Sequence, residues 1–192
     1  TGEMRWMAVN RHEQSQVGHY YLLKRDYEQA WQWYKKAAEE RPPVEPIQLS
    51  DFVELVRQRR TFQNPLFFEY YCLHKLGRTA EAEQRLKKFR ESMTLKWEEE
   101  DLDRLWLDLS SPEAKAQFAH VVNFVTPVLQ SAYMTEVFFS LDAAAEGAEF
   151  FKQQVEKADT DAERFAGLVC QSQLLLASEA DEQYADLVVH QL

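Results

Sequence analysis

The chain has 192 residues, of which 45% are hydrophobic and 28% are charged, a composition typical of a folded globular protein. It contains no run of about 18 apolar residues, which excludes a membrane-spanning helix, and its 5 glycines and 6 prolines are too few for a sheet-rich fold. The net charge of −10 argues against binding to nucleic acid.

The charge is unevenly distributed along the chain. Residues 1–97 carry 17 basic and 13 acidic side chains, whereas residues 98–192 carry 5 basic and 19 acidic ones. An ordinary solvated surface would account for this distribution. The alternative is an electrostatic dipole that orients a basic partner towards the C-terminal half, or that favours head-to-tail self-association.

The first part of the chain predicts a helical hairpin. Apolar residues at helical spacing indicate a helix over residues 11–23, and Asp26 can accept hydrogen bonds from the free amides of a second helix. This second helix is expected to end near Arg41, because Pro42 and Pro43 cannot continue it.

Three further helices are expected before residue 94. Ser50 can cap the first of them. Asn64 precedes the second, which continues to Lys75 and has a proline in its first turn, where proline is tolerated. The third extends from Thr79 to about Met93 after a short turn.

The following segments also predict helices. Residues 97–109 carry tryptophan and leucine at the spacing of a buried stripe. Ser111 begins a helix that is expected to break or kink at Pro127. Residues 128–141 and 143–158 are expected to form two more helices, or one long bent helix.

Two helices are expected at the end of the chain. Thr160 and Glu163 match a capping box that introduces a helix over about 161–177. Ser178 and Asp181 introduce a last one. The whole chain thus predicts nine to eleven helices, no strand, and an all-α fold.

The first hairpin carries small and aromatic residues at fixed intervals. In number and spacing these residues resemble one tetratricopeptide repeat, a unit of 34 residues folded as two antiparallel helices. The matching positions within residues 11–44 are Gly18, Tyr21, Ala30, Tyr34, Ala37 and Pro42. Gln14 and Val17 replace the usual tryptophan and leucine.

A second, weaker copy covers residues 63–96. Gly77 lies in its turn, Ala82 occupies the small-residue position of the second helix, and Leu86 occupies the aromatic position. Tyr70 stands where the family has glycine, so the approach of the two helices is expected to differ there.

The resemblance implies tetratricopeptide-like antiparallel hairpins, arranged as an α-α superhelix or solenoid and continued by a C-terminal helical bundle. Residues 1–96 would form the hairpins, with an inserted helix at about 48–60. Residues 97–192 would form an acidic helical region packed on them, which can end in a third, degenerate repeat over residues 161–192. Together they are expected to make one continuous structural domain.

The sequence predicts no catalytic residue, cofactor or metal site. The stretch HEQSQVGH is similar to a zinc-protease signature, but Gln16 stands four residues after His12, where that chemistry needs a second histidine. Cys72 and Cys170 are expected to be buried free thiols, with a disulfide left open. The chain is expected to be soluble and cytoplasmic, with a removed N-terminal signal left open.

The family resemblance implies a protein-interaction module that binds a peptide or protein segment in a groove lined by first helices. The groove positions, carried over from the family, are His12, Ser15, His19, Leu22, Asn64, Phe67, Tyr71 and His74. Alanine at both Phe67 and Tyr71 should then abolish binding and leave the helices intact. Whether the groove is open or is filled by the added helices is left open.

A second hypothesis is a small-molecule or lipid binder. It depends on an apolar cavity between the middle helices. The aromatic residues that would line this cavity are Phe124, Phe138, Phe139 and Phe150.

Overall fold

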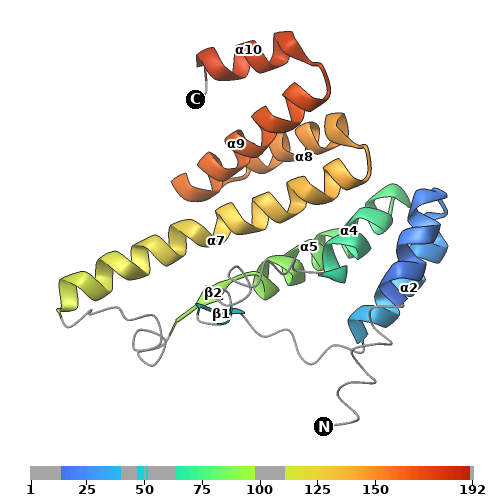
Figure 1. Cartoon of the computed structure of the whole chain (residues 1–192), viewed down its shortest axis with the longest axis horizontal. Coiled ribbons are helices and arrows are strands. Elements are labelled where there is room, and N and C mark those ends of the chain that lie inside the picture. The colour runs from blue at the N-terminus through green and yellow to red at the C-terminus, as the bar shows by residue number, and fades with distance from the viewer. Residues whose placement is uncertain (1–13, 40–46, 50, 52–63, 98–110, 191–192) are drawn as a thin grey trace. The chain divides into compact units, whose positions relative to one another are not determined.

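The structure is a computed structural model that describes residues 14–39, 47–49, 51, 64–97 and 111–190. Almost all of these residues are helical, which confirms the all-α class (Figure 1). The sequence predicts no strand, but the described residues include two strands of two residues each, β1 (Ile47–Gln48) and β2 (Leu95–Lys96). The chain divides into two compact units, Thr1–Met93 and Thr94–Leu192.

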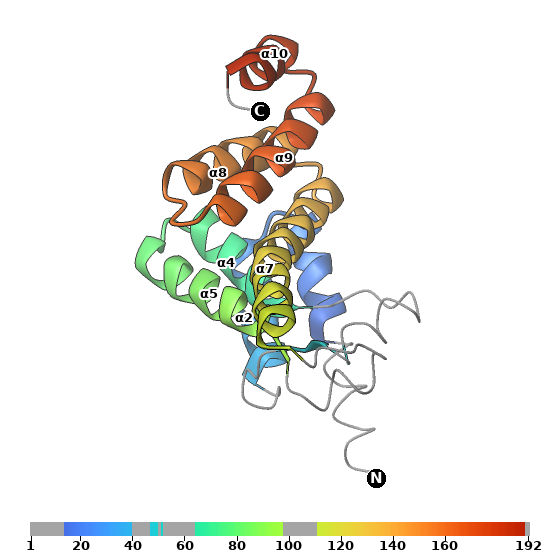
Figure 2. The ribbon, with the colours of Figure 1, turned by 90° about the vertical axis from the view of Figure 1, so that its left-hand side faces the viewer.

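The first unit contains a helix over residues 14–23, followed by α2 (Tyr27–Glu39), α4 (Pro65–Lys75) and α5 (Thr79–Ser92). Helix α4 packs against both α2 and α5 (Figure 1 and Figure 2). The predicted helix that begins at Ser50 lies outside the described residues, as does the stripe over residues 98–109.

Helix α4 is the centre of the first unit. Eight consecutive residues, from Leu66 to Leu73, are buried. A helix with an apolar surface all round is stable only when neighbours cover every side. The position of α4 between two other helices meets this need, and it determines which side chains of the unit remain accessible.

Asn64 caps α4 and also joins it to the end of α5. The Asn64 side chain accepts a hydrogen bond from the amide of Leu66 at 3.1 Å. Its Nδ2 donates to Ser92 Oγ at 2.8 Å, and Ser92 Oγ donates to the carbonyl of Phe89 at 2.6 Å. Because Asn64 is 1% exposed, these bonds satisfy polar groups that would be costly to bury alone.

The spacing of Gly18 and Tyr34 reflects a close crossing of two helices. A Cβ atom at position 18 would lie 2.9 Å from Cε1 of Tyr34, so only glycine fits without a shift. Tyr34, Ala30 and Ala37 are buried on the facing side of α2. The pattern of the first hairpin is therefore a packing pattern in this structure.

Arg78 connects the second turn to α2. Its guanidinium lies 4.0 Å from the ring centroid of Trp31. The same side chain donates two hydrogen bonds of 2.7 Å to Glu81 and lies 3.9 Å from Glu28. The cation-π contact and the carboxylates together link the turn of the second hairpin to α2 of the first hairpin.

The second unit contains β2, α7 (Pro112–Ser140), α8 (Ala144–Glu156), α9 (Asp161–Ala177) and α10 (Asp181–His190). Helix α9 packs against α7, α8 and α10. The predicted capping box is confirmed, since Thr160 and Glu163 exchange both of its hydrogen bonds.

Of the two outcomes expected at Pro127, a break or a kink, the break is wrong. Helix α7 continues through this proline and has 29 residues, the long yellow helix of Figure 1. A proline inside a helix leaves the carbonyl four residues earlier without its donor. That carbonyl belongs to Asn123, which is exposed, so water can replace the missing bond. Thr126 Oγ1 also donates to the carbonyl of Val122 at 3.1 Å, which adds a hydrogen bond beside the proline.

Four helix pairs are joined by turns of the same form. Each turn has three residues, and the second of them has a left-handed backbone. These residues are Arg25 (φ 60°), Gly77 (φ 72°), Asp142 (φ 51°) and Glu179 (φ 57°). The amide that follows each of them donates to the carbonyl five residues earlier, at 2.9 to 3.1 Å, which closes the end of the first helix.

The hairpin of α7 and α8 repeats features of the first hairpin that the sequence pattern does not predict. Gly147 lies five residues after its left-handed residue, as Ala30 does in the first hairpin. A Cβ at position 147 would lie 2.7 Å from Cγ of Phe138. Thr135 stands where the first hairpin has Gly18, and this difference hides the relation in the sequence.

We expect the replacement of Glu179 by glycine to stabilise the chain by about 1 kcal/mol, because a residue with a Cβ pays this cost in the left-handed region. The converse change, Gly77→Ala, should destabilise by a similar amount through the backbone alone, since a Cβ there meets nothing within 4 Å. Urea unfolding measures both. As a control, Ala185→Gly within α10 should destabilise by about 1 kcal/mol. Loss of stability in Glu179→Gly would contradict the left-handed backbone at position 179.

Candidate functional site

The structure buries half of the predicted groove residues of the first unit. The exposed fraction is 4% or less for three of them and 6% for the fourth, and these four residues are Leu22, Asn64, Phe67 and Tyr71. A buried side chain offers no contact to a peptide. These four side chains therefore form core of the first unit rather than an accessible surface.

The other predicted groove residues differ in their surroundings. His12 lies outside the described residues. His19 is half-buried, its Nδ1 is 2.7 Å from the hydroxyl of Tyr34, and its ring lies edge-on to Phe68 at 4.7 Å between centroids. Ser15 is half-buried as well, while His74 is exposed and stacks on the ring of Tyr70 at 5.9 Å. Of the predicted groove residues that the structure describes, only His74 is exposed.

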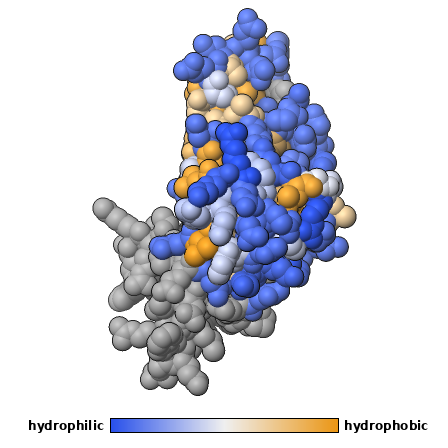
Figure 3. Space-filling view, turned by 90° about the vertical axis from the view of Figure 1, so that its right-hand side faces the viewer, coloured by the Kyte–Doolittle hydropathy of each residue, from blue (hydrophilic) through white to orange (hydrophobic). Residues whose placement is uncertain are grey.

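The four phenylalanines of the lipid-binder hypothesis do not share one environment. Phe138 and Phe150 are buried, and their ring centroids are 5.5 Å apart. Phe124 and Phe139 are 39% and 45% exposed. Two of these rings are therefore packed core and two face the surface. On the face drawn in Figure 3, hydrophobic residues occur in small groups separated by hydrophilic ones.

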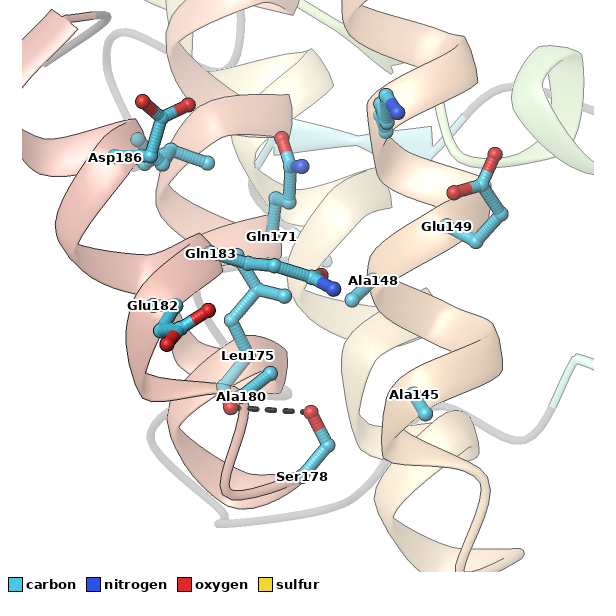
Figure 4. A pocket seen from close by; sticks show the side chains of 12 residues that line it. Ala145, Ala148, Glu149, Gln171, Leu175, Ser178, Ala180, Glu182, Gln183 and Asp186 are labelled. Atoms are coloured by element: carbon cyan, nitrogen blue, oxygen red, sulfur yellow. Dashed lines mark hydrogen bonds between the residues drawn. The ribbon is translucent and has the colours of Figure 1, made fainter.

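A groove lies between α8, α9 and α10 in the second unit, with a volume of about 700 Å³ (Figure 4). Its apolar lining comes from the first turns of α8, from α9, and from α10 and the turn before it. The apolar residues are Ala145, Ala148, Leu175, Ala180 and Leu187. The volume is within the range of 300 to 1,000 Å³ that is usual for ligand sites.

Polar side chains surround this apolar lining. They come from all three helices and from the turn between α9 and α10, and they are Glu149, Lys152, Gln171, Ser178, Glu182, Gln183 and Asp186. Three of these side chains are carboxylates and one is an ammonium group. Figure 4 shows Gln171 between the two walls, with Asp186 on one side and Glu149 on the other. The groove is thus negatively charged and offers amide groups for hydrogen bonding.

The groove forms because α10 packs against the preceding hairpin through few side chains. Leu187 is its one buried residue, whereas α9 buries seven. Tyr34 lies nine residues after the left-handed residue of the first hairpin, and Val188 of α10 lies nine residues after the left-handed residue Glu179. Tyr34 is buried, whereas Val188 is 41% exposed. Helix α10 therefore exposes a side chain at a position that is buried in the first hairpin.

The reactive side chains of the groove lining are its three carboxylates, the ammonium group of Lys152 and one hydroxyl. Ser178 is its one hydroxyl, and the hydroxyl donates to the carbonyl of Leu175 at 3.0 Å. The lining contains no histidine or cysteine that could act as a base or nucleophile. Over the described residues, no three His, Cys, Asp or Glu side chains come together as a group that could hold a metal ion.

Glu69 is a buried carboxyl group that the sequence analysis does not single out. It is 0% exposed, and Arg85 Nε lies 3.1 Å from its Oε2. Neither oxygen receives a hydrogen bond from the residues that the structure describes. Burial raises the pKa of Glu69 from 4.5 to about 7, and the positive charge of Arg85 opposes this shift. A glutamate between aromatic residues in the stretch LFFEYYCL is the sequence signal that would have identified it.

Both cysteines are buried free thiols, as expected. Burial raises the pKa of the Cys72 thiol, and the nearby negative charge of Glu69 raises it further. Burial also raises the pKa of Cys170. Because the thiolate is the reactive form, neither side chain has the environment of a nucleophile.

Helix α7 has 29 residues, which is enough length to cross a bilayer, but neither it nor any other helix over the described residues is sufficiently apolar to do so.

No protein-family model matches the chain, and no curated protein or solved structure matches it either. The tetratricopeptide resemblance therefore stays a prediction, which depends on the residues of the first two hairpins.

Proposed function

We propose that the chain is a non-catalytic protein-interaction module that binds a peptide or protein segment in the groove between α8, α9 and α10. The observation that carries this proposal is the groove itself, about 700 Å³ in volume and lined by side chains of three helices. Its apolar lining can bury side chains of a segment, and its polar rim can bind the main chain.

The binding surface of this proposal differs from the one that the family resemblance implies. In the first unit α4, the first helix of the second predicted repeat, is covered, since it is buried from Leu66 to Leu73. In the second unit, Gln171 and Leu175 of α9 line an open space. Side chains that line this groove are therefore the ones whose identity should determine which segment binds.

Selection from a random peptide library against the purified chain tests the proposal. Ala145 is exposed and lines the groove, so Ala145→Trp should fill it without disturbing the core. We expect selected peptides to bind this variant at least tenfold more weakly than the unchanged chain. The larger side chain should occupy the space that the peptide needs.

The matched control is Ala116→Trp, which adds the same side chain at an exposed position of α7 outside the groove. Peptide affinity should not change in this variant. Fluorescence anisotropy of labelled peptides measures both affinities, and circular dichroism shows whether each variant keeps its helices. Equal binding by the chain and by Ala145→Trp would refute the groove as the binding surface.

A further inference from the structure

We infer that the groove between α8, α9 and α10 binds an extended basic segment whose lysine or arginine side chains pair with Glu149, Glu182 and Asp186. This inference deepens the proposed function and rests on it. The three carboxylates come from two walls, with Glu149 on α8 and the other two on α10. Lys152 is the one basic residue of the lining, so negative charge dominates.

The carboxylates are free to take a new partner. Gln153 Nε2 is 3.3 Å from Glu149 Oε1, and His190 Nε2 is 3.7 Å from Asp186 Oδ1. The side chains of His190 and Asp186 are 67% and 71% exposed, so water screens their interaction. The side chain of Glu182 forms no ion pair or hydrogen bond with any residue that the structure describes. An incoming ammonium or guanidinium group therefore displaces only weak contacts.

Gln171 provides a second, independent reason to expect a peptide. The residue is 9% exposed, its side chain lines the groove, and no hydrogen bond joins this side chain to the described part of the chain. The amide reaches water through the groove, and a segment that displaces this water must offer hydrogen bonds in its place. The Gln171 amide can donate and accept at the same time, which matches the N–H and C=O groups of a peptide main chain. Figure 4 shows this side chain between the two walls, where a segment lying along the groove would pass it.

The distribution of charge and amide favours an extended segment over a small cation. The carboxylates lie on two helices and are not among groups that could together hold a metal ion. An extended peptide presents successive side chains to opposite sides about 3.3 Å apart along the chain. Such a segment can direct basic side chains to both walls while its main chain contacts Gln171. The excess of acidic residues over residues 98–192 would attract it from solution.

The test uses two blocked heptapeptides, one with the sequence Ala-Lys-Lys-Ala-Lys-Lys-Ala and one with glutamine in place of every lysine. Adjacent lysines of an extended chain point to opposite sides, so the first peptide can reach both walls. Titration into the whole chain, followed by isothermal calorimetry and by the NMR signals of the side-chain amides, measures binding. We expect the lysine peptide to bind at least tenfold more tightly than the glutamine peptide. It should shift the Gln171 amide signals, and its affinity should fall as salt rises from 50 to 300 mM because screening weakens the charge pairs.

Two double variants with the same net charge distinguish binding in the groove from general attraction of a basic peptide to the acidic chain. Glu182→Gln with Asp186→Asn should weaken binding of the lysine peptide at least tenfold. Glu113→Gln with Glu136→Gln removes two exposed carboxylates of α7 outside the groove, and it should weaken binding less than twofold. In Gln171→Leu, affinity should fall while its dependence on salt stays the same.

Each outcome of these measurements bears on the inference. Equal loss in the two double variants, or equal binding of the two peptides, would overturn it. If the library selection instead gives peptides without basic residues, and Ala145→Trp weakens their binding, the proposed function stands and the basic segment is wrong. If neither the library nor the lysine peptide yields binding that Ala145→Trp weakens, both fail.

Discussion

Replacement of Phe67 by alanine is expected to lower the free energy of unfolding by about 3–5 kcal/mol, the usual cost of removing a fully buried phenylalanine. Phe67 is 0% exposed, and its ring lies 5.3 Å from the centroids of both Tyr70 and Phe89. The central position of α4 leaves no side from which solvent could fill the cavity. Urea unfolding followed by circular dichroism measures the change.

His74→Ala is the matched control for Phe67→Ala, since His74 lies on the same helix but is exposed. Its effect should stay within about 0.5 kcal/mol, as for most surface substitutions. If both variants are equally stable, Phe67 is not core. The expectation that alanine at Phe67 and Tyr71 abolishes binding and leaves the helices intact therefore needs correction, because both side chains support the fold.

Local signals in the sequence predict the beginnings of most described helices. Asn64, Ser111 and Thr160 each accept the hydrogen bond that a capping residue should accept. Capping depends on residues within one turn of each other, so a single sequence contains the necessary information. The same holds for the small residues of the first hairpin, whose spacing reflects one pair of adjacent helices.

The sequence is less informative where a feature depends on distant segments. Residues 112–140 form one helix although Pro127 removes a backbone hydrogen bond, because the cost of that one bond is local. The sequence does not show whether exposed carbonyls or packing offset this cost. The left-handed positions at Arg25, Asp142 and Glu179 are equally hard to predict, since none of them is glycine. Only the structure shows that they belong to one turn form.

The candidate site could not be predicted for a similar reason. Positions carried over from a family indicate which way a side chain points in that family, not which helices cover it in this chain. The run of apolar residues from Leu66 to Leu73, interrupted only by Glu69, was the available sign that α4 is covered on all sides. The groove combines Glu149, Gln171 and Asp186 from three helices, and no spacing within one segment marks such a set.

Glu69→Gln is expected to stabilise the chain at pH 8 by up to roughly 3 kcal/mol and to have little effect at pH 4.5. The pKa of Glu69 is 4.5 in an unfolded chain and about 7 in this structure. Between these values the folded chain holds a proton that the unfolded chain has released, so stability falls as pH rises from 4.5 to 7. A difference of about 2.5 pKa units corresponds to roughly 3 kcal/mol. Glutamine is neutral at every pH and should remove this dependence.

Charged groups on two helices face Glu69 and set the size of the effect. Arg85 and Lys88 of α5 and Lys35 of α2 lower its pKa, whereas Glu39 of α2 raises it. Removal of Arg85 in Arg85→Gln should therefore raise the pKa of Glu69 further and lower stability at pH 8. In Glu69→Gln, the side chain of Arg85 is not left in a buried, unpaired state, because it is 27% exposed and reaches water.

Urea unfolding of the chain and of Glu69→Gln at pH 4.5, 6, 7 and 8 measures this dependence, and the difference between the two isolates Glu69 from all other titrating groups. Glu83→Gln, at an exposed position of α5, serves as the control and should follow the unchanged chain at each pH. A stability difference that is constant from pH 4.5 to 8 would show that Glu69 stays charged in the folded chain. The pair with Arg85 would then be strong enough to offset the burial of the carboxylate, and Arg85→Gln would lose far more stability at pH 8 than a partly exposed arginine should lose.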